Sequence, residues 1–308
     1  MKQLVILSGK GGTGKTSVTA AFAHLAAEGE VSIRAVLADA DVDAANLELV
    51  LSPKVEERED FWGGQVAQID PQTCSECGTC IEVCRFDAIY PCPRPLSPWE
   101  GGESYWIDPI ACDGCAACVY QCPEGAITMQ PQLAGEWFQS QSRYGPLFHA
   151  ALRPAQENSG KLVTVIKQHA RLLTMDEGYH LVLVDGPPGI GCPVISAVSG
   201  ADLALIVAEP TVAGIHDMHR VLQVTDHFGV KALVCINKAD IYLAGAAEIE
   251  AFCQEQGIEM VGRIPFDTTV THAMVRGQPV TVYQPESPAS QSLREVWRKV
   301  VDALERLA

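Results

Sequence analysis

The stretch Gly9-Lys10-Gly11-Gly12-Thr13-Gly14-Lys15-Thr16 decides the fold of this chain. An apolar run, Leu4-Val5-Ile6-Leu7, precedes it, and an alanine-rich helical pattern over residues 17–27 follows it. Strand, glycine-rich turn and helix start are the context that a phosphate-binding loop requires. The glycines let consecutive backbone N–H groups turn toward an anion, and the helix adds the positive end of its dipole. The motif predicts that Lys15 reaches the β- and γ-phosphates of a nucleotide and that the Thr16 hydroxyl binds Mg²⁺.

The overall composition limits the classes of function. With 308 residues, 47% of them apolar, the chain can form one large domain or two with a substantial core. Its net charge of −16 disfavours nucleic-acid binding. No apolar run approaches the length of about 18 residues that a transmembrane helix needs, and the N-terminus enters a strand directly, so neither a membrane span nor a signal peptide is expected. Twelve cysteines in a nucleotide-binding chain with a cytoplasmic character indicate metal ligands rather than disulfides.

Three alternating aspartates follow a second apolar stretch. Residues 33–39 have the pattern of a buried parallel strand, which ends in Asp39-Ala40-Asp41-Val42-Asp43. Because ligands bind at the carboxyl ends of strands in open α/β sheets, these carboxylates are expected beside the phosphate loop. Carboxylates suit Mg²⁺ and its bound waters. The alternative is that they cap the next helix, and this alternative fits Asp43 best.

Strands and helices then alternate toward the C-terminus. Strands are predicted over residues 181–184, 203–208, 232–236 and 260–264, and helices over residues 159–173 and 214–228. The first of these strands ends at Asp185 before a Gly-Pro-Pro-Gly turn, the third ends at Asn237, and the last ends at Pro265. A hairpin is expected around Arg143-Tyr144-Gly145. The alternation predicts an α/β fold with a mostly parallel sheet.

A near repeat of cysteines lies between the two halves of this pattern. Ile69-Asp70-Pro71 and Ile107-Asp108-Pro109 each lead into a C-x2-C-x2-C-x3-C run. This run is typical of bacterial two-cluster ferredoxins, in which the fourth cysteine of each run binds the other cluster. Thiolates are soft ligands that suit iron–sulfur clusters, and structural zinc is the alternative. The predicted ligand sets of two 4Fe–4S clusters are therefore Cys74, Cys77, Cys80 and Cys122 for one cluster, and Cys112, Cys115, Cys118 and Cys84 for the other.

The two runs differ in their surroundings. Arg85 follows the fourth cysteine of the first run, where the second run has Pro123. A positive charge beside Cys84 is expected to raise the potential of the cluster that it binds. The segment 90–106 is rich in proline and glycine and is interpreted as a surface loop, with Cys92 as a free thiol rather than a ninth ligand.

The second lysine of the phosphate loop, Lys10, is absent from ordinary phosphate loops. It resembles the deviant loop of the MinD, ParA and nitrogenase iron-protein superfamily of ATPases. The resemblance implies a dimer across ATP, either a homodimer or a heterodimer with a similar ATPase, in which Lys10 reaches the nucleotide of the partner. It also implies that Asp39 is a structural carboxylate on the magnesium side, that Asp41 positions the attacking water, and that Asp185 assists Mg²⁺.

The same resemblance extends to the base and to the domain organisation. It implies that Asn237 contacts the base and that Pro265 borders it. The chain as a whole looks like those members of the superfamily that carry an inserted ferredoxin domain. Residues 1–58 and 131–308 would form a deviant phosphate-loop ATPase domain, and residues 59–130 a small α+β bacterial-type ferredoxin domain with two 4Fe–4S clusters.

Three functions are open at this point. The first is an ATP-gated electron carrier that hydrolyses ATP with Mg²⁺ and serves a redox or iron–sulfur partner protein. The second is a scaffold for cluster assembly or transfer, like the Mrp-type ATPases, which tend to have a C-x2-C pair near the C-terminus that this chain lacks. The third is a positioning ATPase like MinD or ParA, which the acidic charge disfavours. The C-terminal pattern 290–308 predicts an amphipathic helix with a mixed-charge polar face, which favours packing on the domain over membrane binding.

One cysteine outside the two runs lies just after the Gly-Pro-Pro-Gly turn. This turn resembles the second phosphate-sensing switch of the superfamily. Cys192 follows it closely, and in the nitrogenase iron protein cysteines near the same switch bind a cluster shared between subunits. The simpler interpretation is a partly buried thiol at the start of a helix.

Overall fold

The computed structural model describes residues 1–28, 32–91, 105–153 and 159–307. The chain divides into two compact units. The nucleotide unit comprises Met1–Glu59, Glu136–Ala151 and Ser159–Ala308, and the cysteine unit comprises Asp60–Gly135 with Leu152–Asn158.

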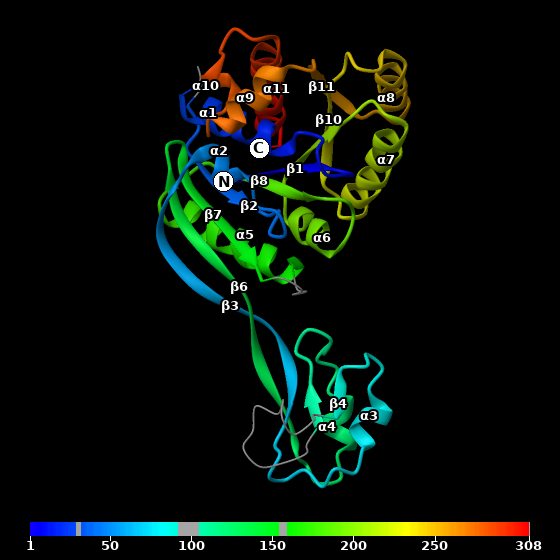
Figure 1. The fold of residues 1–308 in the computed structure, drawn as a ribbon. Coiled ribbons are helices and arrows are strands. Elements are labelled where there is room, and N and C mark those ends of the chain that lie inside the picture. Colours follow the sequence, from blue (N-terminus) through cyan, green and yellow to red (C-terminus); the bar gives the residue numbers. More distant parts are fainter. Residues whose placement is uncertain (29–31, 92–104, 154–158, 308) are drawn as a thin grey trace. The chain divides into compact units, whose positions relative to one another are not determined.

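Strands and helices alternate through the nucleotide unit, and the cysteine unit adds short elements (Figure 1). The strands are β1 (Lys2–Ser8), β2 (Ala35–Asp39), β3 (Lys54–Ile69), β4 (Ile89–Pro91), β5 (Tyr105–Ile107), β6 (Ile127–Ser142), β7 (Gly145–Leu152), β8 (Leu181–Pro188), β9 (Leu203–Ala208), β10 (Lys231–Asn237) and β11 (Glu259–Ile264). The helices are α1 (Lys15–Glu28), α2 (Leu47–Leu51), α3 (Thr79–Val83), α4 (Ala117–Gln121), α5 (Ser159–Asp176), α6 (Cys192–Val198), α7 (Val212–His227), α8 (Leu243–Gln256), α9 (Thr268–Val275), α10 (Val280–Tyr283) and α11 (Pro288–Glu305).

The large sheet has the strand order β11-β10-β9-β1-β8-β2-β7-β6-β3. Every neighbouring pair from β11 to β7 is parallel. The chain turns back at Arg143 and Tyr144 between β6 and β7, where a hairpin is expected from the sequence. The prediction of an α/β fold with a mostly parallel sheet is confirmed, and so is this hairpin.

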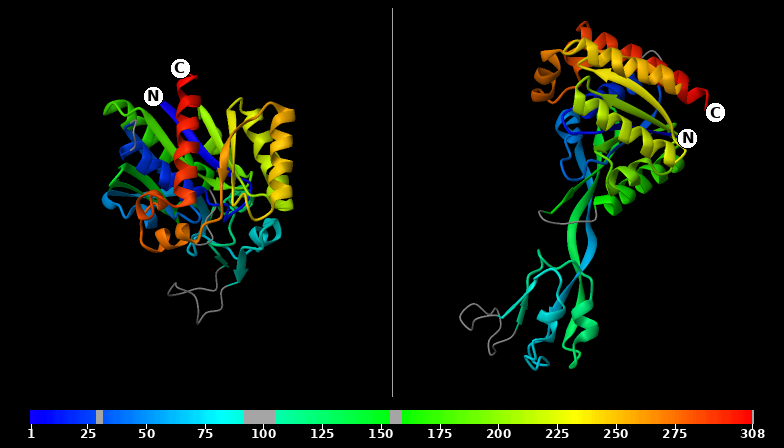
Figure 2. Two further views of the ribbon diagram at one scale, coloured as in Figure 1. Left: turned by 90° about the horizontal axis from the view of Figure 1, so that it is seen from above. Right: turned by 90° about the vertical axis from the view of Figure 1, so that its right-hand side faces the viewer.

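Helices cover both faces of the parallel part of the sheet (Figure 2). On one face, Leu4 and Ile6 of β1 share a core with Phe22 of α1 and with the buried side of α11. On the other face α5, α6, α7 and α8 pack in sequence against β2, β8, β9 and β10. This double cover explains why the strands are apolar on both sides, since parallel sheets bury both faces.

The C-terminal helix packs on the nucleotide unit, as its mixed-charge face predicts. Val296, Trp297 and Val300 of α11 are buried, and the Trp297 ring lies 4.8 Å from the Phe22 ring between centroids. Among the described helices, none has both the length and the apolar character needed to cross a bilayer.

Strand β3 is a feature that the sequence analysis does not predict. Its first seven residues, 54–60, are all exposed and six of them are charged. Its last residues, which include Ala67 and Ile69, join the core of the cysteine unit. Strand β3 pairs with β6 in the sheet, but solvent surrounds its first half. Because neither face of that half is buried, its apolar residues do not alternate with polar ones, and the sequence pattern does not indicate a strand.

The cysteine unit is built from the near repeat in a reciprocal way. The backbone N–H of Asp70 donates to the Ala126 carbonyl at 2.7 Å, and that of Asp108 donates to the Ala88 carbonyl at 2.8 Å. Each half of the repeat therefore closes on the other half. Ile89 and Ile107 pair directly between β4 and β5 and are buried with the cysteines.

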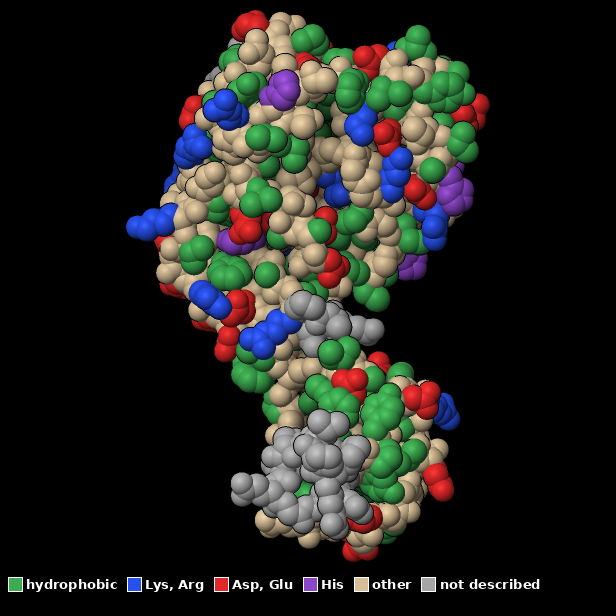
Figure 3. Space-filling model, viewed as in Figure 1, with side chains coloured by type: hydrophobic (Ala, Val, Ile, Leu, Met, Phe, Trp, Pro, Cys, Tyr) green, Lys and Arg blue, Asp and Glu red, His purple; other side chains and the backbone are tan. Residues whose placement is uncertain are grey.

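In the described part of the cysteine unit, acidic side chains far outnumber basic ones (Figure 3). Its described acidic side chains are Asp60, Asp70, Glu76, Glu82, Asp87, Asp108, Asp113 and Glu124, and its described basic side chains are Arg85 and Arg153.

Candidate functional site

The phosphate loop connects β1 to α1 in a backbone form that needs glycine. Gly12 and Gly14 have φ of 76° and 97°, values that side chains other than glycine rarely allow. A Cβ atom on Gly14 would lie 2.4 Å from Nδ2 of Asn237. That amide donates to the Thr13 carbonyl at 2.7 Å, so Asn237 fastens the loop from the end of β10. Its predicted contact with the base remains a prediction.

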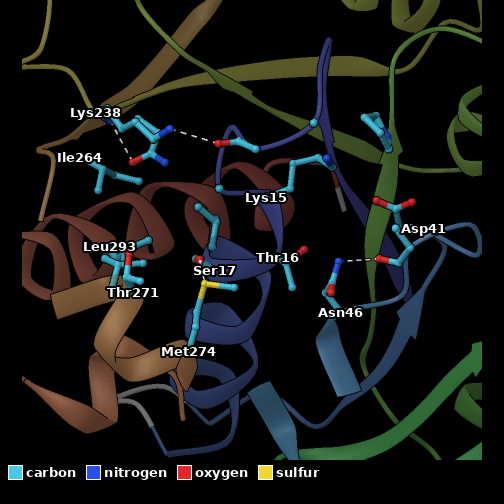
Figure 4. A pocket seen from close by; sticks show the side chains of 18 of the residues that line it. Lys15, Thr16, Ser17, Asp41, Asn46, Lys238, Ile264, Thr271, Met274 and Leu293 are labelled. Carbon is cyan, nitrogen blue, oxygen red and sulfur yellow. Dashed lines mark hydrogen bonds between the residues drawn. The ribbon is translucent and has the colours of Figure 1, made fainter. Parts of the chain in front are cut away.

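A cavity of about 720 Å³ opens over this loop. Lys15, Thr16 and Ser17 line it from the start of α1, Asp41 and Asn46 from the loop after β2, and Lys238 from the loop after β10 (Figure 4). Its lining also includes Gly11, Gly12, Gly14, Asp43, Pro187, Pro188, Asn237, Pro265 and Phe266. The size is that of a small-molecule or nucleotide site. Most of the sequence-predicted nucleotide residues therefore meet at one cavity.

Asp39 holds the loop that leads to α2. Its carboxylate accepts backbone N–H groups of Asp41 at 3.1 Å, Asn46 at 3.1 Å and Leu47 at 3.0 Å. The side chain is fully buried, and burial together with the neighbouring Asp185 raises its pKa well above the ordinary value. Asp39 thus has a structural role, and its predicted place on the magnesium side remains a prediction.

Asp185 lies opposite Asp39 on the adjacent strand β8. Its Oδ1 accepts the Thr19 hydroxyl at 3.0 Å, and its buried Oδ2 has no hydrogen-bond partner among the described residues. Burial raises the pKa of Asp185 to about 6, although the Lys15 ammonium opposes the rise. An unpartnered carboxylate oxygen beside a phosphate loop fits a hard cation such as Mg²⁺.

Asp41 is half-buried at the cavity, and Asp43 is exposed beside it. Burial raises the pKa of Asp41, whereas the Lys15 ammonium lowers it. Of the two carboxylates of this loop that line the cavity, Asp41 is therefore the one partly shielded from solvent, which suits a role in positioning water.

Lys10 does not line the cavity, and Glu209 holds its side chain. The Lys10 ammonium lies 2.5 Å from one Glu209 oxygen, and the Lys238 ammonium lies 3.0 Å from the other. Lys238 also donates to the Gly12 carbonyl at 3.1 Å. Despite partial burial, these hydrogen bonds keep the pKa of Glu209 below its ordinary value. The reach of Lys10 to a partner nucleotide remains a prediction.

Glu209 and Lys238 are site residues that the sequence analysis misses. Glu209 directly follows β9 and Lys238 directly follows β10. The signal that identifies them is their position at the carboxyl ends of parallel strands, the same signal that identifies Asp39 and Asn237.

The eight predicted cluster ligands line two small cavities in the cysteine unit. One cavity is lined by Cys74, Cys77, Cys80 and Cys122, and the other by Cys84, Cys112, Cys115 and Cys118. Each cavity thus takes three cysteines from one run and the fourth from the other. The two groups are the same as the two sets expected from the spacing, and ligation itself remains a prediction.

The surroundings of these thiols fit thiolate ligands. Backbone N–H groups of Ala88 and Ala126 donate to the sulfurs of Cys84 at 3.4 Å and Cys122 at 3.3 Å. Burial raises the pKa of the Cys118 thiol to about 11, so metal binding has to displace its proton. In the described part of the chain, no group of three or more His, Cys, Asp and Glu side chains is placed to hold a single metal ion.

The sequence analysis also singles out Cys92 and Cys192. Cys92 lies outside the described residues. Cys192 is the first residue of α6 and is exposed, so the expectation of a helix-start thiol holds but the expectation of partial burial is wrong. Its side chain is exposed because the next apolar residue of the helix, Val194, is the one that faces the core.

Comparisons with known proteins agree with this geometry. A model of the CobQ/CobB/MinD/ParA nucleotide binding domain matches residues 4–280. An uncharacterized protein of Methanocaldococcus jannaschii is 32% identical over 298 residues, which cover 97% of this chain and 96% of that protein. An iron–sulfur cluster carrier protein of Pyrococcus horikoshii is 26% identical over 140 residues, 41% of this chain and 46% of the carrier.

A solved structure shares the fold. The septum site-determining protein MinD of Pyrococcus horikoshii, complexed with Mg-ADP, matches with a TM-score of 0.59 and 19% identity. The match covers 100% of this chain and 98% of that chain.

Asp185→Asn is expected to stabilise the metal-free fold at neutral pH. Folding raises the pKa of Asp185 from 3.8 to about 6. The protonated Asp185 side chain therefore contributes fully to stability below pH 3.8, and this contribution is lost as pH rises through about 6. The substitution should then raise the free energy of unfolding by about 1–3 kcal/mol at pH 7.5, and by less as pH falls toward 4. Urea unfolding in EDTA measures this.

The exposed neighbour Asp43→Asn is the control for this substitution, with an expected change below about 0.5 kcal/mol. If Asp185→Asn and the parent were equally stable at pH 7.5, burial of the ionised Asp185 carboxylate would not destabilise the fold, and the prediction would be wrong.

Proposed function

Because the chain belongs to the CobQ/CobB/MinD/ParA family of nucleotide-binding proteins, we propose that it is an ATP-hydrolysing iron–sulfur protein that passes electrons to a partner protein under the control of ATP. One observation carries the proposal. Two sets of four cysteines, each around its own cavity, share a chain with a complete phosphate loop and its carboxylates.

The nucleotide part of the proposal assigns a task to each group at the large cavity. Backbone N–H groups of the phosphate loop and the Lys15 ammonium bind the phosphates. Thr16 and Asp185 hold Mg²⁺, and Asp39 fixes the loop that carries Asp41. Asp41 orients the water that attacks the γ-phosphate, and the products are ADP and phosphate. Asn237 and Pro265 border the base.

The cluster part of the proposal uses the interleaved cysteines. We assign one 4Fe–4S cluster to each cavity, within an inserted ferredoxin-like domain at residues 59–130. When bound, these clusters would accept and release single electrons. The N–H groups of Ala88 and Ala126 would then stabilise negative charge on the sulfurs of Cys84 and Cys122. Arg85, exposed beside Cys84, would raise the potential of the cluster which that thiolate holds.

The partner part of the proposal has two levels. ATP joins two subunits, in a homodimer or in a heterodimer with a similar ATPase, once Lys10 leaves Glu209 for the nucleotide of the partner. The redox partner then docks on the dimer. The acidic side chains of the cysteine unit favour a partner with a basic surface and disfavour nucleic acid. We place the reaction in the cytoplasm, where thiols stay reduced.

A second function has one specific observation in its favour. The similarity to an iron–sulfur cluster carrier protein supports a role in cluster transfer. That match covers less than half of each protein, and it leaves the eight interleaved cysteines to be explained. A cluster fixed by ligands from both runs is harder to release than one held at a single pair, so electron transfer ranks first. A positioning ATPase like MinD would not need these cysteines.

Asp41→Ala is expected to keep ATP binding and to lose hydrolysis. Without the carboxylate that orients water, turnover should fall by about 10²–10⁴-fold, the usual size of such a contribution. Phosphate release and nucleotide binding are measured in parallel. Asp43→Ala, at an exposed acid of the same cavity, should turn over like the parent. If Asp41→Ala also turned over like the parent, another residue would have to position the water.

Paired cysteine substitutions test the clusters. The parent should bind about eight irons, because two interleaved runs hold two 4Fe–4S clusters. Cys80→Ser with Cys122→Ser damages one cavity and should leave about four irons. Cys80→Ser with Cys84→Ser changes the same number of thiols within one run but damages both cavities, so iron should fall below that value. Anaerobic metal analysis and EPR of the reduced proteins measure this.

The two pairs of cysteine substitutions distinguish interleaved cluster ligands from ligands that come from one run each. If each run bound its own cluster, the pair within one run would keep half of the iron instead. Zinc in place of iron in the parent would overturn the electron-carrier proposal.

A further inference from the structure

Three polar side chains form a connected line at the edge of the nucleotide unit. Glu48 of α2 lies 2.9 Å from Nδ1 of His149 on β7. The other ring nitrogen of His149, Nε2, lies 2.8 Å from the Ser140 hydroxyl on β6. His149 and Ser140 are buried, whereas the Glu48 side chain is 40% exposed.

The hydrogen bonds in this line have one consistent direction. The Glu48 carboxylate can only accept, so Nδ1 carries the ring proton and donates it. Burial lowers the pKa of His149, so the ring is neutral and its Nε2 accepts the Ser140 O–H. The ring also stacks on Phe138 of β6, with centroids 5.0 Å apart. Both the polar and the apolar contacts of His149 therefore reach β6.

One end of the line leads to the nucleotide cavity. Glu48 follows Asn46 and Leu47 directly, and the N–H groups of those two residues bind the Asp39 carboxylate. Asn46 and Asp41, at the two ends of the same loop, line the cavity. A change of this loop on nucleotide binding would therefore reach the helix that carries Glu48.

The other end of the line leads along one strand to the cysteines. Strand β6 contains Ser140 near its end and begins at Ile127, which is buried among the cysteines of its own unit. The residue before it, Ala126, donates its N–H to the Cys122 sulfur at 3.3 Å. A shift or a change of order along β6 therefore reaches the backbone that supports a predicted cluster ligand.

The order serine, histidine, carboxylate also occurs in hydrolases, but this line is not placed for that chemistry. The Ser140 side chain has no exposed surface, and neither Ser140 nor His149 lines the nucleotide cavity or the two cysteine cavities. A nucleophile has to reach its substrate. The line is therefore a connection between elements.

We propose that Glu48, His149 and Ser140 form a relay that ties strand β6 to the loop between Asp39 and α2, so that bound nucleotide changes the order of the strand that leads to the cysteines. The relay rests on the proposed function and adds to it the residues that couple its two parts. All three are positioning residues, because none of them touches nucleotide or cluster ligands. Coupling of this kind typically changes an equilibrium about 5–150-fold.

Amide hydrogen exchange of the cluster-loaded, full-length protein tests the relay. A non-hydrolysable ATP analogue with Mg²⁺ should slow exchange in three segments of the parent: 9–16, 43–51 and 136–142. Glu48→Ala removes the most exposed member of the relay and leaves the core intact. It should keep the analogue-dependent change at 9–16 and reduce the change at 136–142 from roughly fivefold or more to less than twofold. Ser140→Ala and His149→Gln should do the same.

A second histidine provides the matched control. His24 of α1 lies 2.9 Å from the Thr281 hydroxyl and 3.6 Å from Glu28, so its hydroxyl and carboxylate partners both lie outside β6. Its ring contacts Tyr144, in the turn that follows β6. His24→Gln should keep the full analogue effect at 136–142.

The outcomes separate the relay from the proposed function. Protection at 9–16 with no effect at 136–142 in the parent would overturn the relay alone. So would an effect at 136–142 that survives all three relay substitutions, or one that His24→Gln removes as well. An absence of protection at 9–16 in the parent would overturn ATP binding, and with it both proposals.

Discussion

Two carboxylates buried side by side, Asp39 and Asp185, are the constraint on which the nucleotide unit depends. Their Cα atoms are paired across β2 and β8, and both side chains are almost completely inaccessible. Burying two like charges is unfavourable unless other groups compensate. Backbone N–H groups compensate Asp39, while Lys15 and Thr19 only partly compensate Asp185. A cation would satisfy the oxygen left unpartnered, so the cost of burying Asp185 and the proposed affinity for Mg²⁺ would have one origin.

The cysteine unit follows a different principle, which is reciprocity between the two halves of its repeat. Each half supplies three thiols to one cavity and one thiol to the other, and each half receives a backbone hydrogen bond from the other. Neither half would enclose a complete set of four thiols alone. If each cavity holds a cluster, as proposed, loss of one cluster should loosen both halves, since the small apolar core contains the cysteines themselves.

Much of this could be predicted from the sequence because the signals are local. The phosphate loop, the apolar strands and the cysteine runs each reveal themselves within about a dozen residues. Strand β3 could not be predicted, because its charged first half is ordered by pairing with a distant strand. Glu209 was missed because no motif marks it, although its place at a strand end does. The Glu48–His149–Ser140 relay joins three elements far apart in sequence, and only packing brings them together.

The central claim is that ATP binding and the redox state of the proposed clusters are coupled within one chain. Thermodynamic coupling is reciprocal, so if ATP shifts the cluster potentials, reduction must shift the affinity for ATP by the matching free energy. The direct measurement is an anaerobic EPR redox titration with and without a non-hydrolysable ATP analogue, combined with the affinity of that analogue for the oxidised and reduced protein. The account predicts a shift of about 40–130 mV and a matching change in affinity of about 5–150-fold. Unchanged potentials together with unchanged affinity would contradict it, and would leave ATP only the role of selecting which partner docks.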